Sequence, residues 1–186
     1  MQQNREQALA LLTEYTKSES LLKHSRAVEA AMRWYAQNNN LPADEVEKWG
    51  ITGLLHDFDY EQHPLPEAPD GHPFFGNRIL EELGYPQDIR DSIMGHANYS
   101  GVPRSSQMAK TLFAVDELCG FIVACSLVRP DKLIKNVEVK SVRKKLKTKE
   151  FARAVSREDI DQGALELGVD LDQHIANVIA ALSDLT

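Results

Sequence analysis

The residues with the clearest capacity for chemistry are histidines and aspartates that recur at places where helices are expected. Six of them stand out: His24, His56, Asp57, His72, His96 and Asp116. Imidazole and carboxylate groups are ligands of divalent transition metals, and helices around a common core can direct them to one point. In the adjacent pair His56-Asp57 the imidazole can hold one ion while the carboxylate bridges to a second. The set favours iron, manganese, nickel or zinc, and magnesium less.

No single histidine carries this interpretation, because a lone imidazole on a helix is more often a structural or surface group than a ligand. Asp116 is more informative. It lies in the mostly apolar run from Leu112 to Leu118, where a buried carboxylate is costly without a cation or several donors. The competing interpretation makes Asp116 a surface acid beside Glu117.

Two further histidines lie outside this set. His63 is in the same proline-rich segment as His72 and could replace it as a ligand, although a surface position is the more frequent use of a loop histidine. His174 lies beside polar residues in the last amphipathic segment, and we expect it to be exposed.

The elements that must position these residues are predicted to be helices, because apolar residues recur at three- and four-residue steps and alternating β-rich runs are nearly absent. The segment from Phe58 to Pro73 contains four of the eight prolines and is predicted to be a long loop, a candidate lid. The predicted helices cover about 5–17, 19–38, 42–57, 73–83 and 86–95, then a stretch from Ser105 or Ser106 to before Pro130, about 139–147, a stretch capped by Ser156, and about 170–185.

The length of 186 residues suits a single domain or one domain with an appended arm. A hydrophobic fraction of 42% and a charged fraction of 26% argue against a disordered or fibrous chain. The longest nearly apolar stretch, Leu118 to Val128, is too short to cross a bilayer, and we expect no membrane partner. With no secretory signal visible, we expect a cytoplasmic protein with Cys119 and Cys125 as reduced core thiols.

The charge is unevenly distributed. The net charge is −7, yet the segment from Lys132 to Lys149 holds eight basic residues against Glu138 alone. An acidic chain argues against duplex nucleic acid as a partner, and no aromatic residues are interleaved to stack single-stranded bases. The plain interpretation of this segment is the solvated face of a helix, and the alternative is an arm that contacts substrate phosphate through Lys145.

The order of His24, then His56-Asp57, then Asp116 on successive helices resembles the signature of the HD superfamily of metal-dependent phosphohydrolases. His72 and His96 match the positions that hold a second metal in dinuclear members of this superfamily. The resemblance implies one ion on His24, His56, Asp57 and Asp116. It also implies that Asp57 bridges to a second ion on His72 and His96.

The same resemblance implies an all-α fold, an HD-domain-like orthogonal helical bundle of about eight helices. We expect residues 1–130 to form the metal-binding helical domain and residues 131–186 to form a C-terminal helical extension packed on it. Two transition-metal cations would lower the pKa of a coordinated water and stabilise charge on a phosphoryl group. The predicted activity is hydrolysis of a phosphomonoester or phosphodiester of a nucleotide or other small phosphorylated metabolite.

The chain departs from the superfamily after the His-Asp pair. Many members continue with Ile-Gly-Lys, whereas this chain has Phe58-Asp59-Tyr60-Glu61 and so lacks a lysine for substrate phosphate. The candidate catalytic residues are Asp57 and Asp59, and we favour Asp59 as a carboxylate behind the metal ligands. Two other functions stay open: a di-iron oxygenase with the same ligands, and a non-catalytic nucleotide-sensing HD domain.

Overall fold

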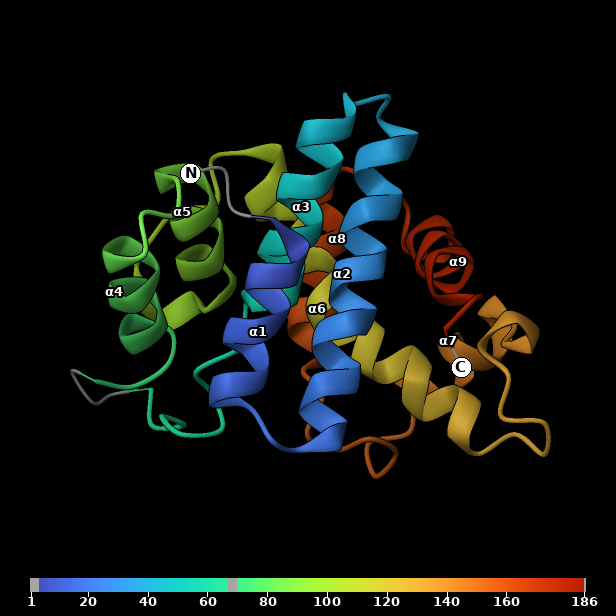
Figure 1. Cartoon of the computed structure of the whole chain (residues 1–186). Helices are drawn as coiled ribbons and strands as arrows, with labels where there is room; N and C mark the ends of the chain where they lie inside the picture. Colours follow the sequence, from blue (N-terminus) through green and yellow to red (C-terminus); the bar gives the residue numbers. More distant parts are fainter. Residues whose placement is uncertain (1–3, 67–69, 186) are drawn as a thin grey trace. The chain divides into compact units, whose positions relative to one another are not determined.

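The computed structural model describes residues 4–66 and 70–185, and every regular element in that part of the chain is a helix (Figure 1). The predicted all-α fold class is confirmed. The elements in chain order are α1 (Arg5–Tyr15), α2 (Glu19–Asn38), α3 (Ala43–Leu55), α4 (Phe74–Glu82), α5 (Gln87–His96), the 3-10 helix η1 (Asn98–Ser100), α6 (Gln107–Leu127), the 3-10 helix η2 (Ile134–Asn136), α7 (Val139–Leu146), α8 (Arg157–Leu167) and α9 (Leu171–Leu182).

The starts of four helices, α1, α6, α8 and α9, follow from side chains that accept hydrogen bonds from the first free backbone N–H groups. The Ser106 hydroxyl accepts from the N–H of Ala109, which decides between the two serines considered as the cap of α6. Ser156 caps α8 in the same way, as predicted. The loop before α4 is also observed, except that residues 67–69 lie outside the described part of the chain.

The chain forms two compact units, one ending at Leu112 and the other beginning at Phe113. In the first unit α3 is the central helix, because it contacts α1, α2 and α5, and α5 in turn contacts α4 (Figure 1). The division predicted at residues 130 and 131 stays a prediction.

Helix α3 is buried on almost every side of its second half, which is why its sequence reads as a continuous apolar run. Two glycines allow its close approach to α2. A Cβ at Gly53 would lie 2.9 Å from the Val28 carbonyl oxygen, and a Cβ at Gly50 would lie 2.4 Å from the Arg33 side chain. The His56-Asp57 pair therefore follows a helix that is fixed from several directions.

In the second unit α9 contacts α7, α8 and η2. The close approach of α8 to the Phe113–Leu127 part of α6 requires Gly163, since a Cβ there would lie 2.6 Å from the Cα of Ala114. Both cysteines are free and buried in this unit, as expected of core thiols.

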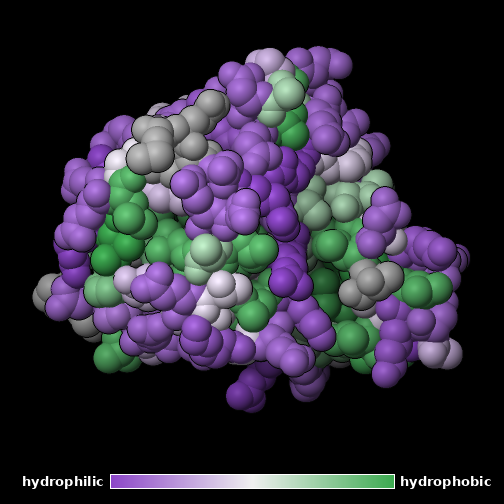
Figure 2. Space-filling model, in the orientation of Figure 1, coloured by the Kyte–Doolittle hydropathy of each residue, from purple (hydrophilic) through white to green (hydrophobic). Residues whose placement is uncertain are grey.

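Hydrophilic side chains predominate on the face shown in Figure 2, with hydrophobic atoms reaching the surface between them. Large apolar side chains that are exposed occur in both units: Tyr60, Leu65, Leu83, Tyr99, Leu127, Val128, Leu133 and Leu165. Within the described part of the chain, none of the helices combines the length and the apolar character needed to span a membrane.

Candidate metal centre

Asp57 lies in the tight turn that follows α3, and this turn is attached to the α1–α2 junction. The buried Thr16 hydroxyl donates to the Phe58 carbonyl at 2.9 Å. The Glu61 carboxylate accepts from the backbone N–H groups of Lys17 and Ser18 at 2.7 and 2.9 Å. These bonds fix the backbone on the C-terminal side of Asp57, while α3 fixes it on the other.

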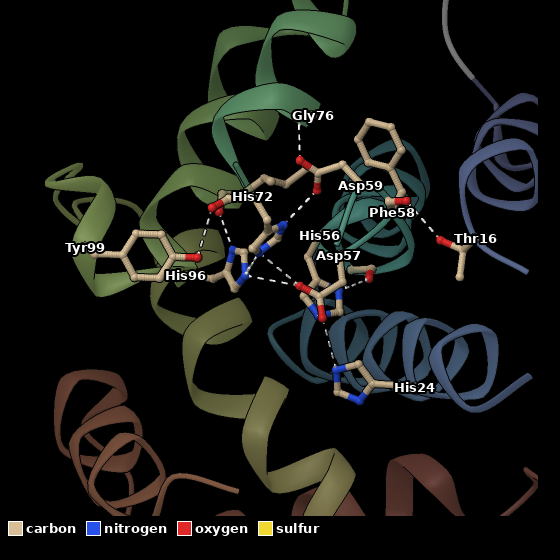
Figure 3. Close-up of polar contacts among 12 residues, drawn as sticks. Thr16, His24, His56, Asp57, Phe58, Asp59, His72, Gly76, His96 and Tyr99 are labelled. Carbon is tan, nitrogen blue, oxygen red and sulfur yellow. Dashed lines mark hydrogen bonds and ion pairs between the residues drawn. The ribbon is translucent and has the colours of Figure 1, made fainter. Parts of the chain in front are cut away.

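Four imidazoles surround the Asp57 carboxylate, two on each oxygen (Figure 3). Oδ2 lies 3.4 Å from Nε2 of His56 and 3.9 Å from Nε2 of His24. Oδ1 lies 3.3 Å from Nε2 of His72 and 3.4 Å from Nε2 of His96. The ligand atoms thus form two groups of three, each with its atoms within 4.8 Å of one another and with Asp57 in common.

The Nδ1 atoms of three of these rings are already used. His56 donates to the Gly53 carbonyl at 2.8 Å, and His96 donates to the carbonyl of Ile93. His72 donates to Asp59 Oδ1 at 2.7 Å. Because these acceptors have no proton to give, each Nδ1 carries its hydrogen, and in the neutral ring Nε2 is the lone-pair nitrogen that metals bind.

The Nε2 atoms of His72 and His96 are 3.1 Å apart and both face Asp57 Oδ1. Two lone pairs at this distance repel unless a proton or a cation lies between or beside them. One shared proton satisfies only this pair of nitrogens, whereas a metal ion accepts both nitrogens and the carboxylate oxygen together. The donor set therefore fits a divalent transition metal, with Asp57, His72 and His96 as ligands on one side and Asp57, His56 and His24 on the other.

The electrostatics of the cluster favour an ionised Asp57. Burial alone would raise the pKa of Asp57, but its imidazole neighbours outweigh burial and hold that pKa well below its ordinary value. For rings that also carry a proton on Nε2, the largest opposing contributions are the electrostatic attraction and the hydrogen bond of His56, followed by the hydrogen bond of His96 and the attraction of His72. A cation bound at Nε2 would take the place of these protons. The carboxylate is thus available to two positive charges at once.

The Asp59 side chain lies behind His72 and is only 1% exposed. Its Oδ1 accepts from His72, and its Oδ2 accepts from the backbone N–H of Gly76 at 2.7 Å (Figure 3). Gly76 is required for this contact, since a Cβ there would lie 2.8 Å from the carboxyl carbon of Asp59. The ring of His72 is therefore held in one orientation by a fixed anion.

A family model for the HD domain matches residues 21–120, which is more than half of the chain. The chain belongs to the HD domain family. No curated protein and no solved structure matches the chain. HD domains bind divalent metals and are commonly hydrolases, and the basic segment from Lys132 to Lys149 lies outside the matched region.

The HD domain brings together five of the six predicted ligands. His24 comes from α2, His56 from the end of α3, Asp57 from the next turn, His72 from the loop and His96 from the last turn of α5. The sixth, Asp116, is on α6 within the second unit, and its ligation stays a prediction. His63 stacks on the Phe75 ring with 3.6 Å between ring centroids, while His72 occupies the position facing Asp57.

Lys145, the predicted phosphate contact, is on α7 of the second unit. Its ammonium group lies 4.5 Å from the centroid of the Phe151 ring. The contact with Phe151 does not test a contact with substrate, so the role of Lys145 stays a prediction.

The expectation that His174 is exposed is wrong. The side chain is completely buried, and its Nε2 donates to the Ala114 carbonyl at 2.9 Å. Burial is the main reason that the pKa of His174 is lowered, and the hydrogen bond to Ala114 opposes this shift. The polar neighbours Asp172 and Gln173 suggested solvent, but His174 lies on the opposite, inward side of α9 with Ile175 and Val178.

Sequence reasoning also missed Tyr99, which lies in η1 at the edge of the site. Its hydroxyl donates to the His72 carbonyl at 3.0 Å (Figure 3). Burial raises the pKa of Tyr99 to about 12, with smaller contributions from Asp57, Asp59 and Tyr60. A tyrosine three residues after a predicted ligand was the available signal, but its partner is a backbone carbonyl 27 residues away and leaves no trace in the sequence.

Proposed function

We propose that this HD domain is a metal-dependent phosphohydrolase that acts on a nucleotide or another small phosphorylated metabolite through two cations. The observation that carries the proposal is the placement of one imidazole pair on each oxygen of Asp57. When bound, such cations supply a water of lowered pKa and neutralise charge on a phosphoryl group under in-line attack.

The role we assign to Asp57 is to hold the two positions at a fixed separation. Its low pKa keeps both oxygens ionised near neutral pH, so neither cation has to displace a proton from the carboxyl group. The turn that carries it is anchored by Thr16 and Glu61, which limits the movement of the carboxylate when a substrate binds.

The histidines serve in different environments. His56, His72 and His96 are buried, with their Nδ1 hydrogens committed to fixed acceptors. The side chains of His24 and Asp57 are 21% and 18% exposed, so the cluster is open to solvent along this edge. A phosphate ester would approach from the open edge, while the buried rings hold their orientation.

The proposal includes residues of the second unit. Asp116 would complete the first position with a second carboxylate. Lys145 would contact the substrate phosphate, because this chain has no lysine directly after the His-Asp pair. The loop from Phe58 to Pro73 would act as the lid that closes over the bound ester.

The proposal is tested with metal-free protein reloaded with Fe²⁺, Mn²⁺, Ni²⁺ or Zn²⁺ and assayed for phosphate release against a panel of phosphomonoesters and phosphodiesters. We expect release from at least one ester with the wild-type protein. Asp57→Ala and His56→Ala should abolish it while far-UV circular dichroism stays unchanged. Release that persists at wild-type rates in both variants would refute the proposal.

The same panel separates the two competing functions. Oxygen uptake by the iron-loaded protein on an organic substrate, without phosphate release, would assign an oxygenase. Tight nucleotide binding without turnover in any metal would assign a sensor, and Asp57→Ala would then leave binding largely intact.

A further inference from the structure

We propose that Asp59 is the positioning residue that decides whether the second cation binds, and so whether this centre holds two ions or one. The inference rests on the two-cation part of the proposed function. It concerns the position formed by Asp57 Oδ1, His72 and His96, and it leaves the His24 and His56 position unaffected.

The first step is that the Nδ1 atoms of the three buried histidines donate to acceptors of different charge. His56 and His96 each donate to a carbonyl three residues earlier in their own chain segment, at Gly53 and Ile93, and these acceptors are neutral. His72 alone among the three donates to a carboxylate, at 2.7 Å. A charged acceptor strengthens this hydrogen bond and increases the electron-donating power of the opposite nitrogen, Nε2.

The second step is the cost of burying Asp59. A carboxylate that is 1% exposed is unfavourable without positive charge nearby. Within residues 4–66 and 70–185, the group that contacts this carboxylate and can carry positive charge is His72, and the other oxygen is bonded to the neutral Gly76 N–H. A cation on Nε2 of His72 supplies that charge through the ring, so metal binding and the buried anion stabilise each other.

The third step is the fit of the carboxylate in its place. The absence of a side chain at Gly76 admits Asp59, because a Cβ would lie 2.8 Å from its carboxyl carbon and 2.9 Å from Oδ2. Asp59 also comes two residues after Asp57 in the same anchored turn. One turn of backbone thus supplies both the shared ligand and the anion that orients the second histidine.

The closing experiment counts ions and does not use catalysis. Metal-free wild-type protein and the variant Asp59→Asn are dialysed against graded Co²⁺, and bound cobalt is measured by elemental analysis and by the visible absorption of the complex. We expect about two Co²⁺ ions per wild-type chain. In Asp59→Asn one ion should bind as before, and the affinity for the other should fall about 10- to 100-fold.

The matched control is Asp70→Asn, which makes the same substitution two residues before His72. The exposed Asp70 carboxylate pairs with Arg78 and is not bonded to the His72 ring. This variant should bind both ions like the wild type. Equal losses in Asp59→Asn and Asp70→Asn would overturn the inference, because a general charge effect would then explain them.

Folding does not confound the result, because the ion retained at the His24 and His56 position reports an intact site. If Asp59→Asn does not fold, Gly76→Ala takes its place, since the added Cβ displaces the carboxylate without removing it. Loss of the second ion alone in either variant supports the inference, even if the protein hydrolyses no phosphate ester. Two tightly bound ions in either folded variant, or a single ion in the wild type, would overturn it.

Discussion

Two buried histidines, one in each compact unit, show what distinguishes a candidate ligand from a structural group. His72 is 3% exposed and His174 is 0% exposed, so burial does not separate them. His72 donates through Nδ1 to a carboxylate and presents Nε2 to Asp57, whereas His174 donates through Nε2 to a helix carbonyl. The direction of Nε2, toward an anion shared with other imidazoles, is what makes the first histidine a candidate ligand.

The largest expected effect is on phosphate release, and it comes from removing His72, the histidine that faces Asp57. His72→Ala deletes a proposed ligand of the second position and removes the ring that pairs with Oδ1 of the buried Asp59. We expect phosphate release by the metal-loaded protein to fall about 100-fold or more, roughly 3 kcal/mol of transition-state stabilisation. The rate is measured at saturating metal and substrate, together with the number of bound ions.

The counterpart for this measurement is His174→Gln, whose amide can still donate to the Ala114 carbonyl. It should keep both the bound ions and the rate of the wild type. If the two variants lost activity in equal measure, the distinction between the two histidines would fail.

The second effect tests whether His174 stabilises the core of its unit. His174→Ala removes a completely buried ring and leaves the space around Ile175 and Val178 underpacked. We expect the free energy of unfolding to fall by about 2–4 kcal/mol, the range for large-to-small changes in a core. Urea denaturation followed by circular dichroism measures this loss, and bound cobalt in the folded variant should match the wild type. A loss below about 0.5 kcal/mol would mean that His174 contributes little to the core.

The third effect is the dependence of stability on pH. The pKa of His174 in the folded protein is lowered from its ordinary value of 6.5, so as pH falls the unfolded chain binds a proton that the folded chain does not. The contribution of neutral, buried His174 to the free energy of unfolding is therefore constant above the pKa that this group has in the unfolded chain. It is lost as pH decreases below that pKa. Between about pH 7.5 and about pH 5.5, unfolding free energy should decrease more in the wild type than in His174→Gln. Parallel curves would contradict this assignment, because the two proteins share all other titrating groups.

The same contrast explains how far the sequence could be interpreted. Helical periodicity placed α2 correctly, and Ser156 and the loop prolines predicted the start of α8 and the break before α4. The candidate ligands were identifiable because their residue types and order are unusual: His24, His56, Asp57, His72 and His96. They meet because α3 is buried on nearly every side and fixed by contacts with α2 at Gly50 and Gly53.

What the sequence did not contain was the partner of each polar group. The buried state of His174 could not be recognised in the printed chain, since its hydrogen bond to Ala114 is set by packing between elements 60 residues apart. The pairing of Asp59 with His72 depends on the turn after α3 and on the space at Gly76. Tyr99 was missed for the same reason, because its partner is a backbone atom.

The smallest expected effect is that of Tyr99→Phe, which removes one hydrogen bond behind the candidate ligand His72 while keeping the aromatic ring. The Tyr99 side chain is about half exposed, so water can replace the hydroxyl at the His72 carbonyl. We expect the free energy of unfolding to fall by about 0.5–1 kcal/mol and Co²⁺ affinity to change by less than about threefold. A loss of the second ion as large as that in Asp59→Asn would contradict this. The backbone carbonyl of His72, and not only its ring, would then govern the second position.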